Sequence, residues 1–316
     1  MSSAPHLTSF NAKDALDAGF CLSTLSVDHD VHHALSEFKR LSVYSLPVVD
    51  KEGVCLGLVD LGDMVFHLVS CFFKSANVAT PEQLVSVSTT ELDGVTIEAA
   101  FNSTPIATLL NCSGANPYSP LPSDTTTIAD AIAALTKSRR LPLIDAAGKV
   151  VAIISQTNVI RFLAKHHNLV PESIAHKSIA DLNAVTRPLL SIPDSLRAID
   201  AFAILAVKQF SAVGITATGE SETIATLSVK DMTFIASSFT YTVAPVEDFV
   251  KAIRQHNLHT IYPTIGCANT ASLTDVINRL GATKLHRLLV HPAGSSEGYD
   301  GVISLGNIIK VIASHL

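Results

Sequence analysis

Four short fragments of the sequence each end an apolar run with a carboxylate or an amide. They are GLVDLGDMV from Gly57, AIISQTNVI from Ala152, ATLSVKDMT from Ala225 and GVISLGNII from Gly301. The polar residue that ends each fragment's motif is, in order, Asp63, Asn158, Asp231 and Asn307. A carboxylate has two acceptor oxygens and could hold both vicinal hydroxyls of a ribose, whereas an amide has one acceptor oxygen. The fragments therefore predict four related but unequal sugar-binding positions.

The same spacing has a purely structural interpretation. A serine followed three residues later by an acidic or amide side chain is a capping box, which satisfies free N–H groups at a helix start. Three fragments carry such a serine, and these residues are expected to cap their helices in either case: Ser155, Ser228 and Ser304. The first fragment has Asp60 instead, whose charge would repel a phosphate without disturbing a ribose. The sequence alone leaves ligand binding and capping open as alternatives.

Basic residues recur where a predicted helix leads into a predicted strand. A guanidinium group matches the geometry of a phosphate, and a histidine adds a contact that depends on pH. The competing interpretation is that these are solvated residues favoured by the dipole at a helix C-terminus. The candidates for phosphate binding are Arg139, Arg140, Lys208, His286 and Arg287. Ser191 lies near another predicted strand and is a candidate for contact with an adenine base or a phosphate.

The elements that must position these residues also recur. Each fragment follows an apolar run and a polar turn, which predicts a β-hairpin with equivalent positions at Pro47, Pro142, Gly214 and Leu289. Apolar residues at helical spacing precede each hairpin, and a second amphipathic helix follows it. Three helix N-caps are predicted, at Thr126, Asp194 and Ser272. The repeated unit is strand, helix, strand, strand, helix, about 50–60 residues long.

Composition narrows the function class. The 316 residues are 47% hydrophobic and 16% charged, which is typical of a folded protein with more than one domain. A net charge of −6 without a long basic run argues against nucleic acid or an anionic membrane as a partner. The sequence shows no signal peptide, membrane span or cysteine framework, which predicts a cytoplasmic or nuclear address. No nucleophile or acid–base motif is recognisable, so we expect a non-catalytic protein without a metal.

The fourfold unit resembles the CBS domain, which pairs into Bateman modules. The resemblance implies an α+β fold in which four CBS repeats form two Bateman modules, at about residues 20–170 and 180–316, packed as a pseudo-symmetric disc. The predicted boundaries are an N-terminal segment at 1–20, repeats at 21–73, 118–170, 182–240 and 255–316, and a linker at 74–117 with at most one helix.

Four such repeats without a catalytic domain resemble the gamma regulatory subunit of the AMP-activated protein kinase family, most closely in LTDVINRLGATKLHRLLV and GVISLGNIIKVI. The resemblance implies that AMP, ADP or ATP is a regulatory ligand. It also implies that the partners are an alpha-type catalytic and a beta-type scaffold subunit of a kinase. Ribose would be held best by Asp63 and Asp231, less well by Asn307 and least by Asn158.

The chain also departs from the family pattern. Tyr44 and Gln209 stand where the family has arginine, and Lys208 stands where it has histidine, so two cationic contacts are missing. Gly214 replaces the usual proline. These departures support an alternative function, a degenerate CBS scaffold that binds little or no nucleotide and regulates a phosphatase or another enzyme.

Overall fold

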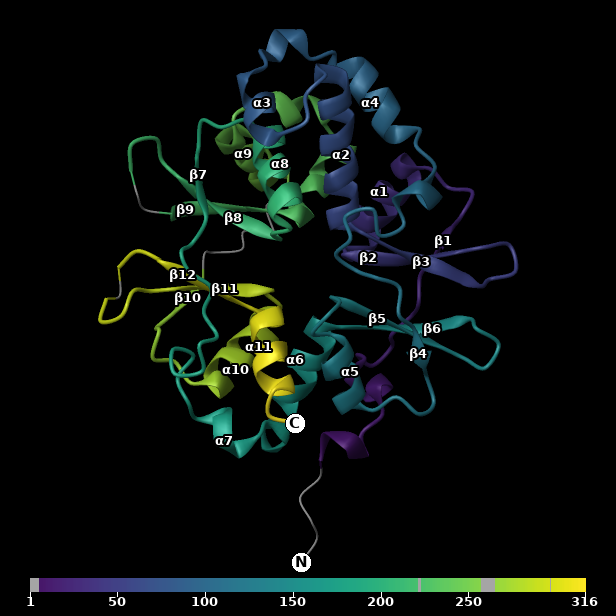
Figure 1. The fold of residues 1–316 in the computed structure, drawn as a ribbon, viewed down its shortest axis with the longest axis vertical. Helices are drawn as coiled ribbons and strands as arrows, with labels where there is room; N and C mark the ends of the chain where they lie inside the picture. Colours follow the sequence, from purple (N-terminus) through teal and green to yellow (C-terminus); the bar gives the residue numbers. More distant parts are fainter. Residues whose placement is uncertain (1–5, 221–222, 257–264, 296) are drawn as a thin grey trace, which may run out of the picture. The chain divides into compact units, whose positions relative to one another are not determined.

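Four three-stranded sheets of one topology recur along the chain in the computed structural model, which describes residues 6–220, 223–256, 265–295 and 297–316 (Figure 1). In each sheet a short first strand runs parallel to the second, and the second and third form an antiparallel hairpin. The strands are β1 (Leu25–Ser26), β2 (Ser45–Val49), β3 (Cys55–Asp60), β4 (Leu121–Pro122), β5 (Arg140–Ile144), β6 (Val150–Ser155), β7 (Ser191–Pro193), β8 (Ala212–Thr216), β9 (Thr223–Ser228), β10 (Gly266–Cys267), β11 (Arg287–Val290) and β12 (Gly301–Ser304).

The hairpin registers confirm the repeat alignment made from the sequence. Pro47, Pro142, Gly214 and Leu289 each occupy the third residue of the central strand. They lie opposite Leu58, Ile153, Thr226 and Val302 respectively.

Two helices flank each hairpin, as the apolar spacing predicted. They are α1 (Val31–Leu41) and α2 (Leu61–Ala76), α5 (Ile128–Ala134) and α6 (Gln156–Lys165), α8 (Ala198–Lys208) and η6 (Val229–Ala236), and α10 (Leu273–Thr283) and α11 (Leu305–Ala313). The element η6 is a 3₁₀ helix where the other three repeats have an α-helix. Helix α1 shows the pattern: Val31, Leu35 and Phe38 are buried and Arg40 in its last turn is exposed.

Contacts divide the chain into two compact units that interleave along the sequence. The first unit comprises Met1–Leu22, Asn116–Leu189 and Thr264–Leu316, and the second comprises Ser23–Ala115 and Leu190–Pro263. The second repeat therefore shares a core with the fourth, and the first shares a core with the third. The predicted modules instead separated the chain between residues 170 and 180, with repeats one and two in one module and repeats three and four in the other. The compact units differ from these modules because the helices of alternate repeats bury their apolar faces against each other.

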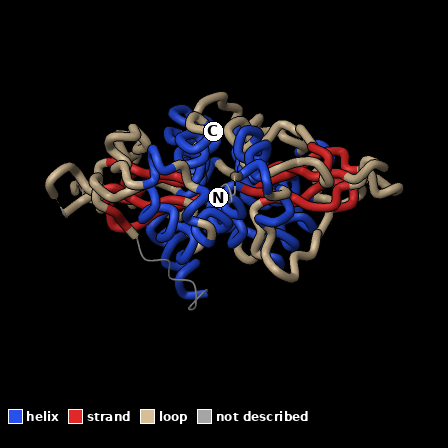
Figure 2. The backbone as a smooth tube through the Cα atoms, turned by 90° about the horizontal axis from the view of Figure 1, so that it is seen from below, coloured by secondary structure: helices blue, strands red, loops and turns tan. Residues whose placement is uncertain are grey.

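Helix packing follows the same reciprocal pattern in both units. In the second unit α2 packs against α8 and α1 against η6, while in the first unit α6 packs against α10 and α5 against α11. In each unit the helices lie between the two sheets, which Figures 1 and 2 show from two directions. Each interface thus joins the first helix of one repeat to the second helix of the other. The predicted α+β class and repeated unit are confirmed.

The stretch predicted as a linker is folded. It contains α3 (Pro81–Ser86), η3 (Thr89–Glu91), α4 (Gly94–Asn102) and η4 (Ile106–Leu109), and α2 extends to Ala76. Helix α4 packs against α2 and α1, and α3 packs against α8. The guanidinium of Arg197 donates to the backbone oxygens of Leu84 (2.6 Å) and Val87 (2.7 Å) and forms a two-bond ion pair with Asp200. This largely buried charge pair therefore links residues 74–117, called the insertion from here on, to α8.

The N-terminal segment belongs to the first unit. Its 3₁₀ turns η1 (Leu7–Ser9) and η2 (Ala12–Ala15) bury Leu7, Ala12 and Ala15 in the core. The Asn11 amide donates to the backbone oxygens of Ser123 and Asp124 at 3.2 Å. The segment thus closes the apolar edge of α5 and α6.

Of the three predicted N-caps, one is confirmed. Ser272 caps α10, whereas Thr127 caps α5 and Arg197 precedes α8. Thr126 instead donates to the backbone oxygen of Pro122 (2.6 Å), and Asp194 accepts bonds from Thr218. The remaining helices are η5 (His167–Leu169), α7 (Glu172–Ala175), η7 (Phe239–Val243) and α9 (Val246–His256). Among the described residues, no helix combines the length and the apolar character that crossing a membrane requires.

Candidate functional site

The four predicted sugar-binding residues occupy one position, the third residue of the helix after each hairpin. At Asn158 the side-chain oxygen accepts from the Ser155 N–H (3.0 Å), and Asn307 does the same with Ser304 (2.9 Å). In repeat three, Oδ2 of Asp231 accepts from both N–H (2.6 Å) and Oγ (2.8 Å) of Ser228. Capping is therefore confirmed. A carboxylate has two acceptor oxygens at this position, whereas an amide has one.

Asp63 is the most enclosed of the four. It is 1% exposed, and its Oδ1 accepts from both N–H (2.9 Å) and Oγ (2.6 Å) of Ser113. Its Oδ2 accepts from the N–H of Asp60 (2.9 Å), and Oδ1 of Asp60 accepts from the N–H of Asp63. The folded insertion supplies Ser113, so the predicted linker covers the predicted ligand residue. Both Asp63 oxygens accept hydrogen bonds from the chain itself, so Asp63 is a weak candidate for ribose binding.

The environment of Asp63 predicts an unusual pH dependence of stability. Burial, together with the nearby Asp60, raises the pKa of Asp63 to about 7, despite the bonds from Ser113. The folded state then binds a proton more tightly than the unfolded state, so this group stabilises the fold fully below about pH 4 and loses that effect as pH rises through 7. We expect urea denaturation to show that Asp63→Asn flattens the decline in stability between pH 5 and 8.

An Asp14→Asn variant, which changes an exposed cap in η2, is the control for that titration. If Asp63→Asn and Asp14→Asn leave the same slope of stability against pH, the account of Asp63 is wrong.

The chain between repeats two and three contacts Asn307. Thr186 forms a two-way backbone bridge with Val302 of β12, and its Oγ1 accepts from the Asn307 amide at 3.2 Å. A Cβ on Gly301 would lie 2.7 Å from a methyl group of Val185, so glycine permits this close approach. The amide oxygen of Asn307 caps the helix while its nitrogen binds Thr186, and we infer a poor fit to two ribose hydroxyls.

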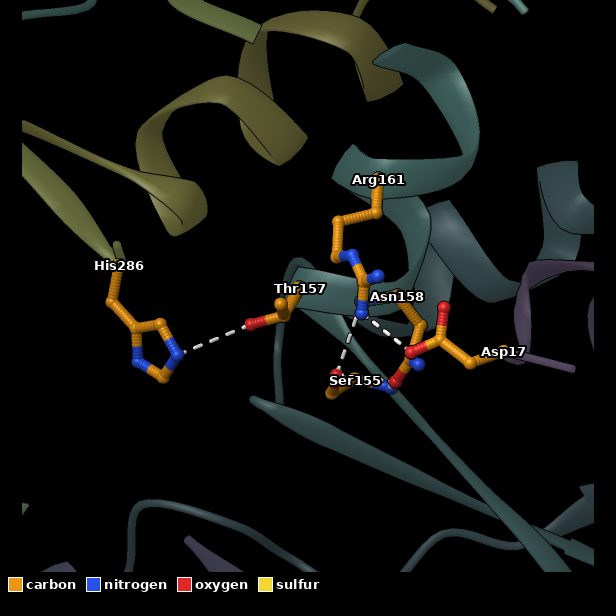
Figure 3. Close-up of polar contacts among 6 residues, drawn as sticks. All are labelled: Asp17, Ser155, Thr157, Asn158, Arg161 and His286. Atoms are coloured by element: carbon orange, nitrogen blue, oxygen red, sulfur yellow. Dashed lines mark hydrogen bonds and ion pairs between the residues drawn. The ribbon is translucent and has the colours of Figure 1, made fainter. Parts of the chain in front are cut away.

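Asn158 lies beside an ion pair that the sequence analysis missed. Figure 3 shows Arg161, one turn further along α6, reaching across to Asp17 of the N-terminal segment. The arginine could have been noticed by its spacing of three residues from Asn158, which places both on one helix face. Its partner could not, because Asp17 is 144 residues away in sequence.

The predicted phosphate-binding residues of the first unit gather near these helix starts. Arg140 and Arg287 open β5 and β11, opposite Ser155 and Ser304. His286 of repeat four reaches α6 of repeat two, with 3.3 Å between its Nε2 and Thr157 Oγ1 (Figure 3). Arg140 and Arg287 thus begin strands that pair with the residues before two helix N-termini, where an anion would be stabilised.

Arg139 plays a different part in the same junction. Its N–H donates to the side-chain oxygen of the buried Asn116 (2.9 Å), and its own backbone oxygen accepts from the guanidinium of Arg140 (2.9 Å). The backbone of Arg139 therefore helps to hold the Arg140 side chain in place.

In the second unit the cation at the equivalent junction comes from another repeat. Lys230, half-buried in η6, donates to Ser42 Oγ (3.1 Å), and its ammonium lies 5.2 Å from the centre of the Tyr44 ring. Burial lowers the pKa of Lys230, while the charge of Asp231 acts in the opposite direction. Repeat three thus supplies a cation where Tyr44 replaces the family's arginine. The signal was in the fragment SVKDM, directly before Asp231.

Two further predicted site residues lie apart from this cation. Lys208 is exposed at the end of α8, where the neighbouring Gln209 donates to the backbone oxygen of Ser113 (2.9 Å). The Ser191 and Thr223 hydroxyls are 3.3 Å apart, and a Cβ on Gly214 would lie 2.7 Å from Ser191 Oγ. Glycine therefore replaces proline because this hydroxyl pair fills the space.

Comparison with known proteins identifies the repeated unit. The CBS domain model matches residues 22–70 and 119–165, so these two segments are CBS domains. No curated protein is significantly similar in sequence. A crystal structure from Methanocaldococcus jannaschii, described as a candidate archaeal homologue of γ-AMPK, matches with a TM-score of 0.70 at 14% identity, over 95% of this chain and 99% of that one. An uncharacterised conserved protein from Pyrococcus horikoshii matches with a TM-score of 0.50 at 14% identity, over 92% and 96%. The likeness shows that the fold is shared.

Proposed function

We propose that this chain, which carries CBS domains at residues 22–70 and 119–165, is a non-catalytic regulatory protein that binds adenine nucleotides. The observation that carries the proposal is the pair Asp231 and Lys230 at the start of η6. A carboxylate for ribose hydroxyls stands next to an ammonium group for phosphate, at a helix N-terminus that also favours an anion.

The nucleotide would report energy status to a protein kinase complex with alpha-type and beta-type subunits. This part of the proposal is supported by the shared fold with the candidate archaeal γ-AMPK homologue. Nucleotide binding would favour the arrangement of α1 on η6 that can hold the nucleotide. A partner protein would then respond to the larger population of this arrangement.

The direct test is calorimetric titration of the full chain with AMP, ADP and ATP. Tyr44 and Gln209 stand where the resemblance implies arginine, so we expect AMP to bind more tightly than ATP. Native mass spectrometry should show the number of nucleotides retained. The absence of binding by all three nucleotides at millimolar concentration would refute the proposal.

A second candidate function, a scaffold without ligand, is favoured by the state of Asp63. Both of its oxygens accept bonds from the chain, and the insertion encloses it. A scaffold regulating a phosphatase or another enzyme predicts partner binding that is independent of nucleotide. A thermal shift with AMP that disappears in Asp231→Ala would exclude this alternative.

A further inference from the structure

A serine with basic neighbours ends helix α1. The sequence at this point is FKRLSVY, in which Lys39 and Arg40 precede Ser42 by three and two residues. Ser42 is exposed, and its backbone adopts a left-handed conformation (φ 53°) that stops the helix. Protein serine kinases that select basic residues on the N-terminal side of the acceptor recognise this arrangement of charge.

A receptor for a phosphate is already present beside this hydroxyl. Lys230 donates to Ser42 Oγ (3.1 Å), so its ammonium lies within reach of any group that the oxygen carries. Lys39 bonds to the Ser237 hydroxyl across the α1–η6 interface, and Arg40 pairs with Glu37 on the exposed face of α1. The cation bonded to Ser42 therefore belongs to another repeat, and two further cations precede Ser42 by two and three residues.

We propose that Ser42 is a phosphorylation site, and that its phosphate is held by Lys230 so that repeat one is fastened to repeat three. The kinase would transfer the γ-phosphoryl group of ATP to Ser42 Oγ. A phosphorus–oxygen bond to the serine forms, the bond to the leaving ADP breaks, and the hydroxyl proton passes to a base of the kinase.

The charges around the new phosphate favour its binding to Lys230. The helix dipole of α1 presents its negative end to Ser42 and opposes the added charge, but this effect is limited to the last turn. The ammonium of Lys230 acts at bonding distance from a partly desolvated position, where a charge-assisted bond is stronger. The acidic groups that act on these cations include Asp231, next to Lys230, and Glu37, which pairs with Arg40.

Access requires only local opening. A kinase reads its substrate as an extended segment, and Lys39 and Arg40 belong to the terminal turn of α1. Terminal turns open at little cost, and here the closing bond from the Ser42 N–H to the Lys39 oxygen is 3.3 Å long.

The first test is to incubate the full chain with ATP and the catalytic subunit of cAMP-dependent protein kinase, followed by peptide mass spectrometry. We expect one phosphoryl group on Ser42, its loss in Ser42→Ala and in Arg40→Gln, and its retention in Ser36→Ala. Ser36 is an exposed serine of the same helix and provides the matched control. No phosphoryl group on Ser42 overturns the proposal.

The second measurement tests the receptor. Phosphorylation should raise the Tm of the wild type by about 2 °C or more, and this rise should be absent in Lys230→Gln, in which Ser42 is still modified. An equal rise in Lys230→Gln, or no rise in the wild type, overturns the role of Lys230.

One consequence rests on the proposed function. The phosphoserine would hold the ammonium that is available to a nucleotide, so the modified chain should lose affinity for AMP. If the unmodified chain binds no AMP, the proposed function fails while the mass spectrometry result stands. If it binds AMP equally before and after modification, the predicted competition is refuted.

Discussion

Replacing Asp231 by asparagine should weaken AMP binding by about tenfold or more, because one charge-assisted bond to a ribose hydroxyl is lost and the bidentate grip with it. The substitution is well controlled by the chain itself. Asn158 and Asn307 occupy the equivalent position and accept the capping bond from their serine at 3.0 and 2.9 Å. Asp231→Asn should therefore keep the cap and the fold while it removes the carboxylate. Calorimetric titration with AMP measures the effect.

Two companion variants separate ribose binding from capping. Asp231→Ala should lose both AMP affinity and about 1 kcal/mol of stability, since the cap is lost as well. Asn158→Asp should leave the Asp231 site unchanged. If Asp231→Asn binds AMP as the wild type does, the ribose contact is not made by this carboxylate.

Truncating Arg197 should cause the largest loss of stability. Its guanidinium binds Asp200 at 2.6 and 2.9 Å, and the two side chains are only 13% and 2% exposed. Removing the arginine leaves a buried carboxylate unpaired and frees the backbone oxygens of Leu84 and Val87. We expect Arg197→Met to lower the free energy of unfolding by about 3–5 kcal/mol, as measured by urea denaturation.

The control is an exposed pair on a neighbouring helix. Lys251 and Glu247 form an ion pair on α9 in which both side chains are about half exposed. Lys251→Ala should leave the free energy of unfolding almost unchanged, because an exposed ion pair contributes little. The double variant Arg197→Met with Asp200→Leu should recover much of the lost stability, because no buried charge then remains. Equal costs for Arg197→Met and Lys251→Ala would contradict this account of the insertion.

The sequence predicted what depends on local periodicity. The four hairpins, their equivalent positions and the capping residues Ser155, Ser228 and Ser304 follow from the spacing of apolar and polar side chains. The pairing of repeat one with three and of two with four could not be predicted. Every repeat has an apolar helix face, and the choice between such faces depends on shape and not on period.

The predicted site was incomplete for a related reason. The fragments around Asp63 and Asp231 are alike and predict the same role, but Ser113, 50 residues away in sequence, bonds to Asp63. Likewise, Lys230 serves Ser42 and Tyr44 from another repeat. Local propensity also failed at two N-caps, where Thr126 and Asp194 bind other partners in the turns before α5 and α8.

The interleaved order of the two units constrains how the protein is made. A nascent chain leaves the ribosome with repeats one and two exposed, and neither has its helix partner until repeat three or four has been synthesised. The second unit can close only after α9 has been synthesised, and the first only after α11 has been synthesised. A premature stop codon after the second repeat would yield two orphaned half-cores, and we expect such a product to be a client of chaperones and proteases.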